Sequence, residues 1–165
     1  SSEPGVSRWR DMSLSGRGLL YVRPPASTAQ VFTTGVRFNV RRNIDQLYQV
    51  VLGGEEGVRG YREDELPTGS TLVGFVEERV TLPWLSPSVD LGLTVFADYG
   101  RGWALDIPFG QDTGWRAAVG GGIRLGFPAG TGSVTHIEVA WPIGRTGGGR
   151  GPVLRTYWSP IETNR

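Results

Sequence analysis

A strict two-residue alternation of polarity constrains the fold more than any other feature of this chain. In residues 114–127 one face carries mostly large apolar side chains, while the other carries only Arg, Ala and Gly. A repeat of two residues is the period of a β-strand, and no segment shows a helical repeat. Similar alternation occurs in residues 29–41, 71–82, 89–98 and 133–143, and residues 17–23 and 153–159 are further short strand candidates. We therefore predict an all-β protein of about seven or eight antiparallel strands.

The length of these segments separates two kinds of β-protein. Several run for ten to fourteen residues, whereas strands of soluble sheets typically have about five to six. A tilted strand that crosses a membrane needs roughly 9 to 11 residues. Aromatic residues also lie near the strand ends, as in the interfacial girdles of membrane barrels; they are Trp103, Trp115, Trp141, Tyr157 and Trp158. The pattern favours a transmembrane β-barrel, and a soluble β-sandwich binding module is the alternative.

The composition argues against several other classes of protein. A net charge of +1 gives no general attraction for nucleic acid, and with no Cys and one His the chain offers little to a metal. No apolar run reaches the roughly 18 to 20 residues of a transmembrane helix. The triplet Gly120–Gly122 lies inside a strand and lacks the helix of a phosphate-binding loop. We expect no enzyme activity, metal or cofactor.

Residues 42–70 interrupt the strand pattern with a connection of nearly thirty residues. Ordinary connections have a median of about 4–6 residues, and much longer ones are commonly functional. At its centre lies the stretch 51–64, which contains four glycines and an Arg-Gly-Tyr step. We expect this loop to have a function of its own.

Several short motifs resemble one family when they are taken together. They are Leu52-Gly53-Gly54, Val58-Arg59-Gly60-Tyr61, Glu77-Glu78-Arg79, Phe96-Ala97-Asp98-Tyr99-Gly100, the Gly-rich strand 118–125 and Val139-Ala140-Trp141-Pro142. In order and spacing, residues 31–159 resemble the BamA, TamA and two-partner-secretion (TpsB) superfamily of outer-membrane barrels. The resemblance implies that Val58, Arg59, Gly60 and Tyr61 lie on a loop that folds into the barrel lumen.

A buried loop arginine needs partners, because an unpaired buried cation is costly. Strand parity directs Asp98 and Glu77 to the lumen, where they could pair with Arg59. The expected docking residues are Glu77, Arg79, Asp98, Gly100, Gly120 and Gly122, with Tyr61 stacked on the last two glycines. The other expected lumen-lining residues are Arg37, Arg116, Arg124, His136 and Glu138. The alternatives are a solvated hairpin tip for the loop and, less favoured, a metal or acid–base pair at His136 and Glu138.

The resemblance covers only the C-terminal half of the family's barrel. An eight-stranded barrel has its interior filled by side chains and would leave no room for the loop. We therefore expect an outer-membrane half-barrel domain at 17–159 with lumen loop 42–70. Residues 1–16 would form a polar tail or frayed strand, and 160–165 a C-terminal tail. A second copy, a different chain or an N-terminal portion of a longer protein would complete the barrel.

The resemblance also implies a function and a setting. It predicts a protein of the bacterial outer membrane that inserts or translocates polypeptides, with the Arg-Gly-Tyr loop as lumen plug or gate. Its partners would be outer-membrane lipid, polypeptide substrates and POTRA-bearing or periplasmic subunits. The alternative function is structural, namely a half-barrel that pairs with a partner to anchor an envelope complex.

Overall fold

The computed structural model describes residues 12–27, 29–42, 50–63, 65–82, 88–105, 110–127, 133–143 and 151–160. This part of the chain contains nine β-strands: β1 Met12–Val22, β2 Gln30–Arg42, β3 Val50–Val51, β4 Pro67–Thr68, β5 Ser70–Thr81, β6 Asp90–Trp103, β7 Gly114–Gly126, β8 Ser133–Ile143 and β9 Val153–Pro160. None of the described residues belongs to a helix that could cross a membrane.

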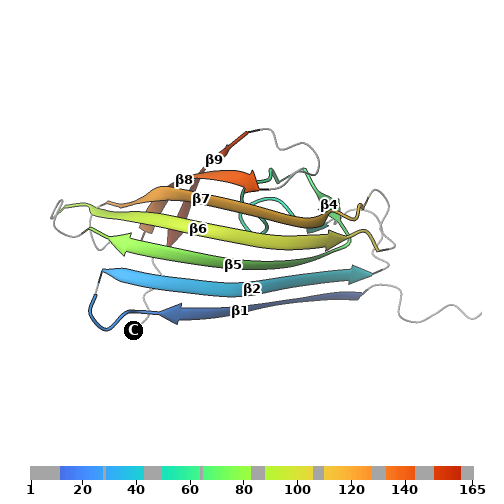
Figure 1. Ribbon diagram of the computed structural model, residues 1–165, viewed down its shortest axis with the longest axis horizontal. Helices are drawn as coiled ribbons and strands as arrows, with labels where there is room; N and C mark the ends of the chain where they lie inside the picture. Colours follow the sequence, from blue (N-terminus) through green and yellow to red (C-terminus); the bar gives the residue numbers. More distant parts are fainter. Residues whose placement is uncertain are drawn as a thin grey trace, which may run out of the picture.

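Seven of the strands form one antiparallel sheet in which each long strand pairs with the next long strand along the chain. Its order is β1-β2-β5-β6-β7-β8-β9, while β3 and β4 form a separate two-stranded sheet within the connection between β2 and β5. The large sheet curls around the segment that carries β3 and β4 (Figure 1). Within the described part of the chain β1 and β9 do not pair, so the sheet is open. The predicted all-β half-barrel is confirmed.

The alternation of the sequence separates the two faces of the sheet. In β6, Val95 is 57% exposed on the convex face, whereas Thr94 is 2% exposed on the concave face. The exposed large side chains of the convex face include Phe32, Val36, Phe38, Val76, Leu93, Val95, Tyr99, Trp115, Val119, Ile123, Trp141, Leu154 and Trp158. The described residues form no second sheet against this face, and a broad exposed apolar surface of this kind suits contact with lipid. Glu78 is an exposed exception opposite Val95, which nothing in the structure explains.

Several strands extend beyond their predicted bounds, and β1 and β6 do so by the most residues. β1 begins at Met12, so residues 12–16 belong to a strand, which was one of the two alternatives expected for residues 1–16. β6 continues to Trp103 through Gly100 and Gly102, where a loop was expected to begin. A Cβ at Gly102 would collide with the Thr68 side chain. This glycine therefore allows β4 to pack against β6 and does not end β6. Pro160 ends β9. Three parts of the prediction lie outside the described residues. They are residues 1–11 of the N-terminal tail, residues 161–165 of the C-terminal tail, and residues 43–49 and 64 of the loop.

The apolar core lies between the loop and the concave face of the sheet. It consists of Leu52, Val58, Tyr61 and Leu66 from the loop, with Val73 of β5 and Ala118 of β7. The loop thus supplies most of the buried apolar side chains in this cluster. Because sheet and loop bury the same core, docking of the loop is part of the fold.

Candidate functional site

The segment 50–68, which we call the docked loop, is closed at its neck by β3 and β4 and has hydrogen bonds of its own. Val58 donates from its amide to the Leu52 carbonyl at 2.7 Å, and Leu52 donates to the Leu66 carbonyl at 3.0 Å. A Cβ at Gly57 would collide with the Leu52 carbonyl, and one at Gly100 would lie 2.9 Å from Cγ2 of Val58. Glycine is therefore needed at Gly57 for the internal contact and at Gly100 for the contact with the sheet.

Arg59 carries the polar part of the contact. Its Nε and Nη2 donate to Oδ2 and Oδ1 of Asp98 at 2.9 and 2.8 Å, and its backbone amide donates to Oδ2 at 2.9 Å. Nη1 donates to Oε2 of Glu77 at 2.7 Å, and Arg79 donates from Nε to the other oxygen of Glu77. Arg59 is only 7% exposed. The structure thus brings together the loop arginine and both of its predicted partners.

The charge state of Arg59 follows from these contacts. Burial lowers the pKa of Arg59, but the hydrogen bonds and charges of Asp98 and Glu77 outweigh burial and raise the pKa above its ordinary value. The guanidinium therefore remains protonated while the loop is docked.

A third carboxylate and an aromatic ring complete the surroundings of Arg59. Its Cζ lies 3.4 Å from the ring centroid of Phe96, a cation–π contact. Oε2 of Glu138 lies 3.7 Å from Nη1, and the other oxygen of Glu138 accepts a hydrogen bond from the Tyr157 hydroxyl at 2.8 Å. His136 stacks on Tyr157 with 4.5 Å between ring centroids, and its Nδ1 lies 3.9 Å from Glu138. Among the residues described, no group of three or more His, Asp or Glu is arranged to hold a metal ion.

Gly60 and Tyr61 bring the loop against β7 and β8. A Cβ at Gly60 would lie 2.6 Å from Cβ of Ala118 and 2.9 Å from the nitrogen of Pro142. Tyr61 is 4% exposed, and the Arg116 guanidinium carbon lies 5.9 Å from its ring centroid. Only glycine permits the loop backbone to approach the sheet so closely at position 60.

The glycines of β7 have a different role from the one predicted. Tyr61 was expected to stack on Gly120 and Gly122. Instead, the space over Gly120 is taken by the Phe96 ring, and that beside Gly122 by the Glu138 side chain and by neighbouring backbone. The missing side chains therefore make room for two residues around Arg59, and this part of the prediction is wrong.

The remaining predicted lumen-lining arginines lie at other points of the concave face. Arg37 donates from Nη1 to the Glu55 carbonyl at 3.2 Å and forms an ion pair with Glu56 at 3.4 Å, so it contacts the docked loop. Arg124 is paired in register with His136, beyond the loop contacts.

Sequence reasoning did not anticipate three residues of this site. They are Phe96 beneath Arg59, Tyr157 on Glu138, and Arg155, whose Nη2 donates to the Tyr61 carbonyl at 2.7 Å. A signal was available in strand parity, because Phe96 shares a face with Asp98, and Arg155 and Tyr157 share one face of β9. The strand β9 thereby joins the network that holds the loop.

An open antiparallel sheet, apolar on its convex side and packed on its concave side against an inward-folded loop, defines a transmembrane β-barrel protein. The family model described as the Omp85 superfamily domain matches residues 22–157. The chain belongs to the Omp85 superfamily, and the predicted resemblance is confirmed. Searches of curated proteins and of solved structures gave no match. Omp85 proteins are bacterial outer-membrane proteins that insert or translocate polypeptides and work with partner subunits.

Proposed function

We propose that this chain forms part of an outer-membrane machine that inserts or translocates polypeptides, and that the docked loop plugs or gates its lumen. The observation that carries the proposal is the position of Arg59, whose side chain contacts carboxylates on three strands, β5, β6 and β8. One loop residue thus links the loop to the middle of the sheet.

The energetics of this contact suit a gate that can open. Removing one partner of a buried ion pair typically destabilises a protein by about 3–5 kcal/mol. Because Arg59 makes most of the buried polar contacts between the docked loop and the sheet, a substrate or partner that binds the carboxylates or displaces Arg59 would lower the population of docked loop.

The structural alternative is supported by a different observation. Strands β1 and β9 are edges of the sheet in the described residues, and unpaired backbone groups are not tolerated in the hydrocarbon of a membrane. Another set of strands must cover both edges. A second copy, a different chain or a further portion of the same protein would do so, and a barrel completed by a partner could serve as an envelope anchor.

The two functions differ in what Arg59→Ala would change. The assembly would be purified from membranes and placed in planar bilayers to measure conductance, and secretion of a reporter polypeptide would be measured in cells. For a gate, we expect higher conductance or altered secretion from Arg59→Ala. The control Arg17→Ala changes an exposed arginine of β1 and should match wild type.

The result that would contradict the proposal is equally definite. If Arg59→Ala lowers the stability of the barrel but leaves conductance and secretion unchanged, the loop is a structural element and the chain a scaffold. A monomeric closed barrel of these strands with the loop outside would contradict both functions.

A further inference from the structure

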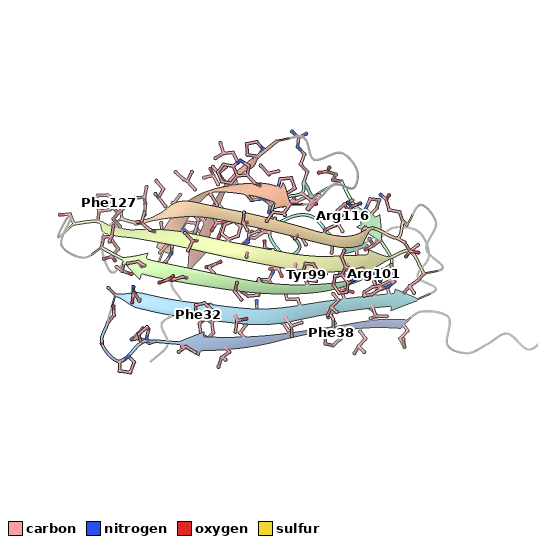
Figure 2. The ribbon with its side chains drawn as sticks, viewed as in Figure 1. Phe32, Phe38, Tyr99, Arg101, Arg116 and Phe127 are labelled. Atoms are coloured by element: carbon pink, nitrogen blue, oxygen red, sulfur yellow. The ribbon has the colours of Figure 1, made fainter. Side chains whose placement is uncertain are left out.

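A single arginine interrupts the apolar convex face at one end of β6. Arg101 follows Tyr99 by two residues and shares its outward parity, and the register sets it opposite Leu72 of β5 and Trp115 of β7. Figure 2 shows Tyr99 and Arg101 near the same end of the strands, with Phe127 at the other end. A cation is therefore placed among apolar side chains on the surface that faces lipid.

Aromatic rings hold this cation from two sides. The guanidinium carbon lies 5.2 Å from the ring centroid of Trp103 and 6.0 Å from that of Trp115. Tyr99 stacks on Trp115 with 4.6 Å between centroids and 5° between planes. These contacts favour an orientation of the guanidinium beside the two indole rings.

Arg101 also has unused hydrogen-bonding capacity. No ion pair joins Arg101 to any acidic side chain in the described ranges. Its Nε is closed to solvent, so an external partner would bind the Nη groups. An arginine in an apolar surface ordinarily has a carboxylate partner or extends into water. Here an external anion would supply the missing partner.

The depth of Arg101 indicates which anion could reach it. From Leu91 to Arg101 the strand advances about 34 Å, at roughly 3.4 Å per residue. With a tilt of about 40° this is roughly 26 Å along the membrane normal, close to the ~25 Å height of the apolar band of outer-membrane barrels. Arg101 would therefore lie where hydrocarbon ends and lipid headgroups begin, as Trp103 and Trp115 also indicate.

We propose that Arg101, oriented by Trp103 and Trp115, binds the phosphate of a lipid headgroup. The planar guanidinium presents paired N–H donors that match two phosphate oxygens, which an ammonium group does not. The indole rings keep the guanidinium plane at the lipid boundary. This site is on the opposite face of the sheet from the docked loop and does not depend on the function proposed for that loop.

The test measures lipid retained by the full chain, purified from membranes with any barrel partner, in neutral detergent. Native mass spectrometry would compare phosphatidylglycerol with diacylglycerol, which has similar acyl chains but no phosphate. We expect phosphatidylglycerol to bind wild type at least about tenfold more tightly, the scale of one charge-assisted hydrogen bond. Arg101→Gln should remove that preference, and Arg101→Lys should retain only part of it.

Matched controls separate binding from damage to the fold. Arg17→Gln, on the concave face of β1, should keep the full preference, and diacylglycerol should bind Arg101→Gln as it binds wild type. An excess of inorganic phosphate should not displace phosphatidylglycerol. Displacement would mean that the site binds free phosphate and would overturn the assignment of a lipid ligand. If Arg101→Gln fails to fold, wild type and Arg101→Lys still decide the matter. Equal binding of the two lipids by wild type would show that Arg101 only extends to water.

Discussion

The guanidinium of Arg59 holds both carboxylate oxygens of Asp98, through hydrogen bonds of 2.9 Å to Oδ2 and 2.8 Å to Oδ1. Arg59 lies on the docked loop and Asp98 in the middle of β6, so this pair joins two segments that are far apart in sequence. Such a paired contact has a geometry that lysine cannot reproduce. The pair therefore contributes directly to how tightly the loop is held.

Removal of the cation should release the loop. In Arg59→Ala the carboxylates of Asp98, Glu77 and Glu138 would remain buried without their common partner, which destabilises docking by about 3–5 kcal/mol. Chymotrypsin cleavage after Tyr61, which is 4% exposed, should then accelerate at least about 100-fold. Arg59→Lys should release the loop to a smaller extent.

The control for this experiment is Arg17→Ala, which changes an exposed arginine of β1 and should be cleaved at the wild-type rate. Adding Asp98→Ala to Arg59→Ala should cause less further loss than Asp98→Ala alone, because the two residues interact directly. Strictly additive losses, or an unchanged rate in Arg59→Ala, would contradict the role of this pair.

The close approach at Gly60 predicts a steric effect. In Gly60→Ala the new Cβ would lie 2.6 Å from Cβ of Ala118 and 2.9 Å from the nitrogen of Pro142, so we expect overpacking to destabilise the protein by about 1–3 kcal/mol. The double variant with Ala118→Gly should recover part of this loss, since the Pro142 contact remains. Urea unfolding in detergent would measure the change in the free energy of unfolding for both variants. Gly74→Ala, which meets only ordinary contacts at 3.9 Å, is the matched control, and an equal loss there would refute the explanation.

Strand parity made the pairing of Arg59 predictable, but parity alone does not predict how deeply the loop enters the concave face. Alternation assigns Asp98 and Glu77 to the concave face, and the long connection supplies a loop to meet them. It does not fix the depth of the loop, which depends on where the backbone of Gly60 meets β7 and β8. Tyr61 was consequently assigned to space that Phe96 occupies.

The last strand should support the loop through two further hydrogen bonds. Tyr157→Phe would remove the donor to the buried Glu138, which we expect to weaken docking by about 1–3 kcal/mol. Arg155→Ala would remove the 2.7 Å bond to the Tyr61 carbonyl and should have a similar or smaller effect. Hydrogen exchange of the docked loop would measure both. The control is Thr156→Ala, whose side chain is exposed on the other face of β9, and its loop amides should exchange at the wild-type rate. If the loop amides of Tyr157→Phe also exchange at the wild-type rate, β9 does not hold the loop.

Docking should be insensitive to pH near neutrality and weaken in strong base. Burial raises the pKa of the Tyr61 phenol above its ordinary value of 10.0, so docking favours the neutral phenol. This contribution is fully present below pH 10.0 and is lost as the pH rises towards the higher pKa of the docked state. Arg59, with its pKa raised, remains charged over this range.

Subtilisin cleavage within the loop, normalised to a free peptide of residues 55–66, would measure this dependence. Wild type should show constant protection between about pH 7 and 9 and lose protection above about pH 10. Tyr61→Phe should lose markedly less, since it has no phenol to ionise. An equal loss in both proteins would assign the effect to another group.

The bounds of β6 show a second limit of sequence reasoning. Gly100 and Gly102 resemble the start of a loop, because glycine is depleted in strands. In the structure they remain in the strand, since Val58 and Thr68 pack where their side chains would be. Glycine in a strand marks either a turn or a close approach, and the choice depends on a contact from a distant segment, which a local pattern does not contain.

The convex face predicts how the sheet responds to an added charge. Val119 lies on this face of β7, opposite Ala97 and Trp141, and has no charged neighbour in these registers. In Val119→Arg an unpaired cation would enter the hydrocarbon, which destabilises outer-membrane barrels by about 2–4 kcal/mol near the midplane. The control Ser15→Arg places the same side chain at an exposed concave position of β1. We expect Val119→Arg to reduce the fraction that resists urea extraction from membranes and Ser15→Arg to leave it unchanged. If both variants resist extraction as wild type does, the convex face is not in contact with lipid.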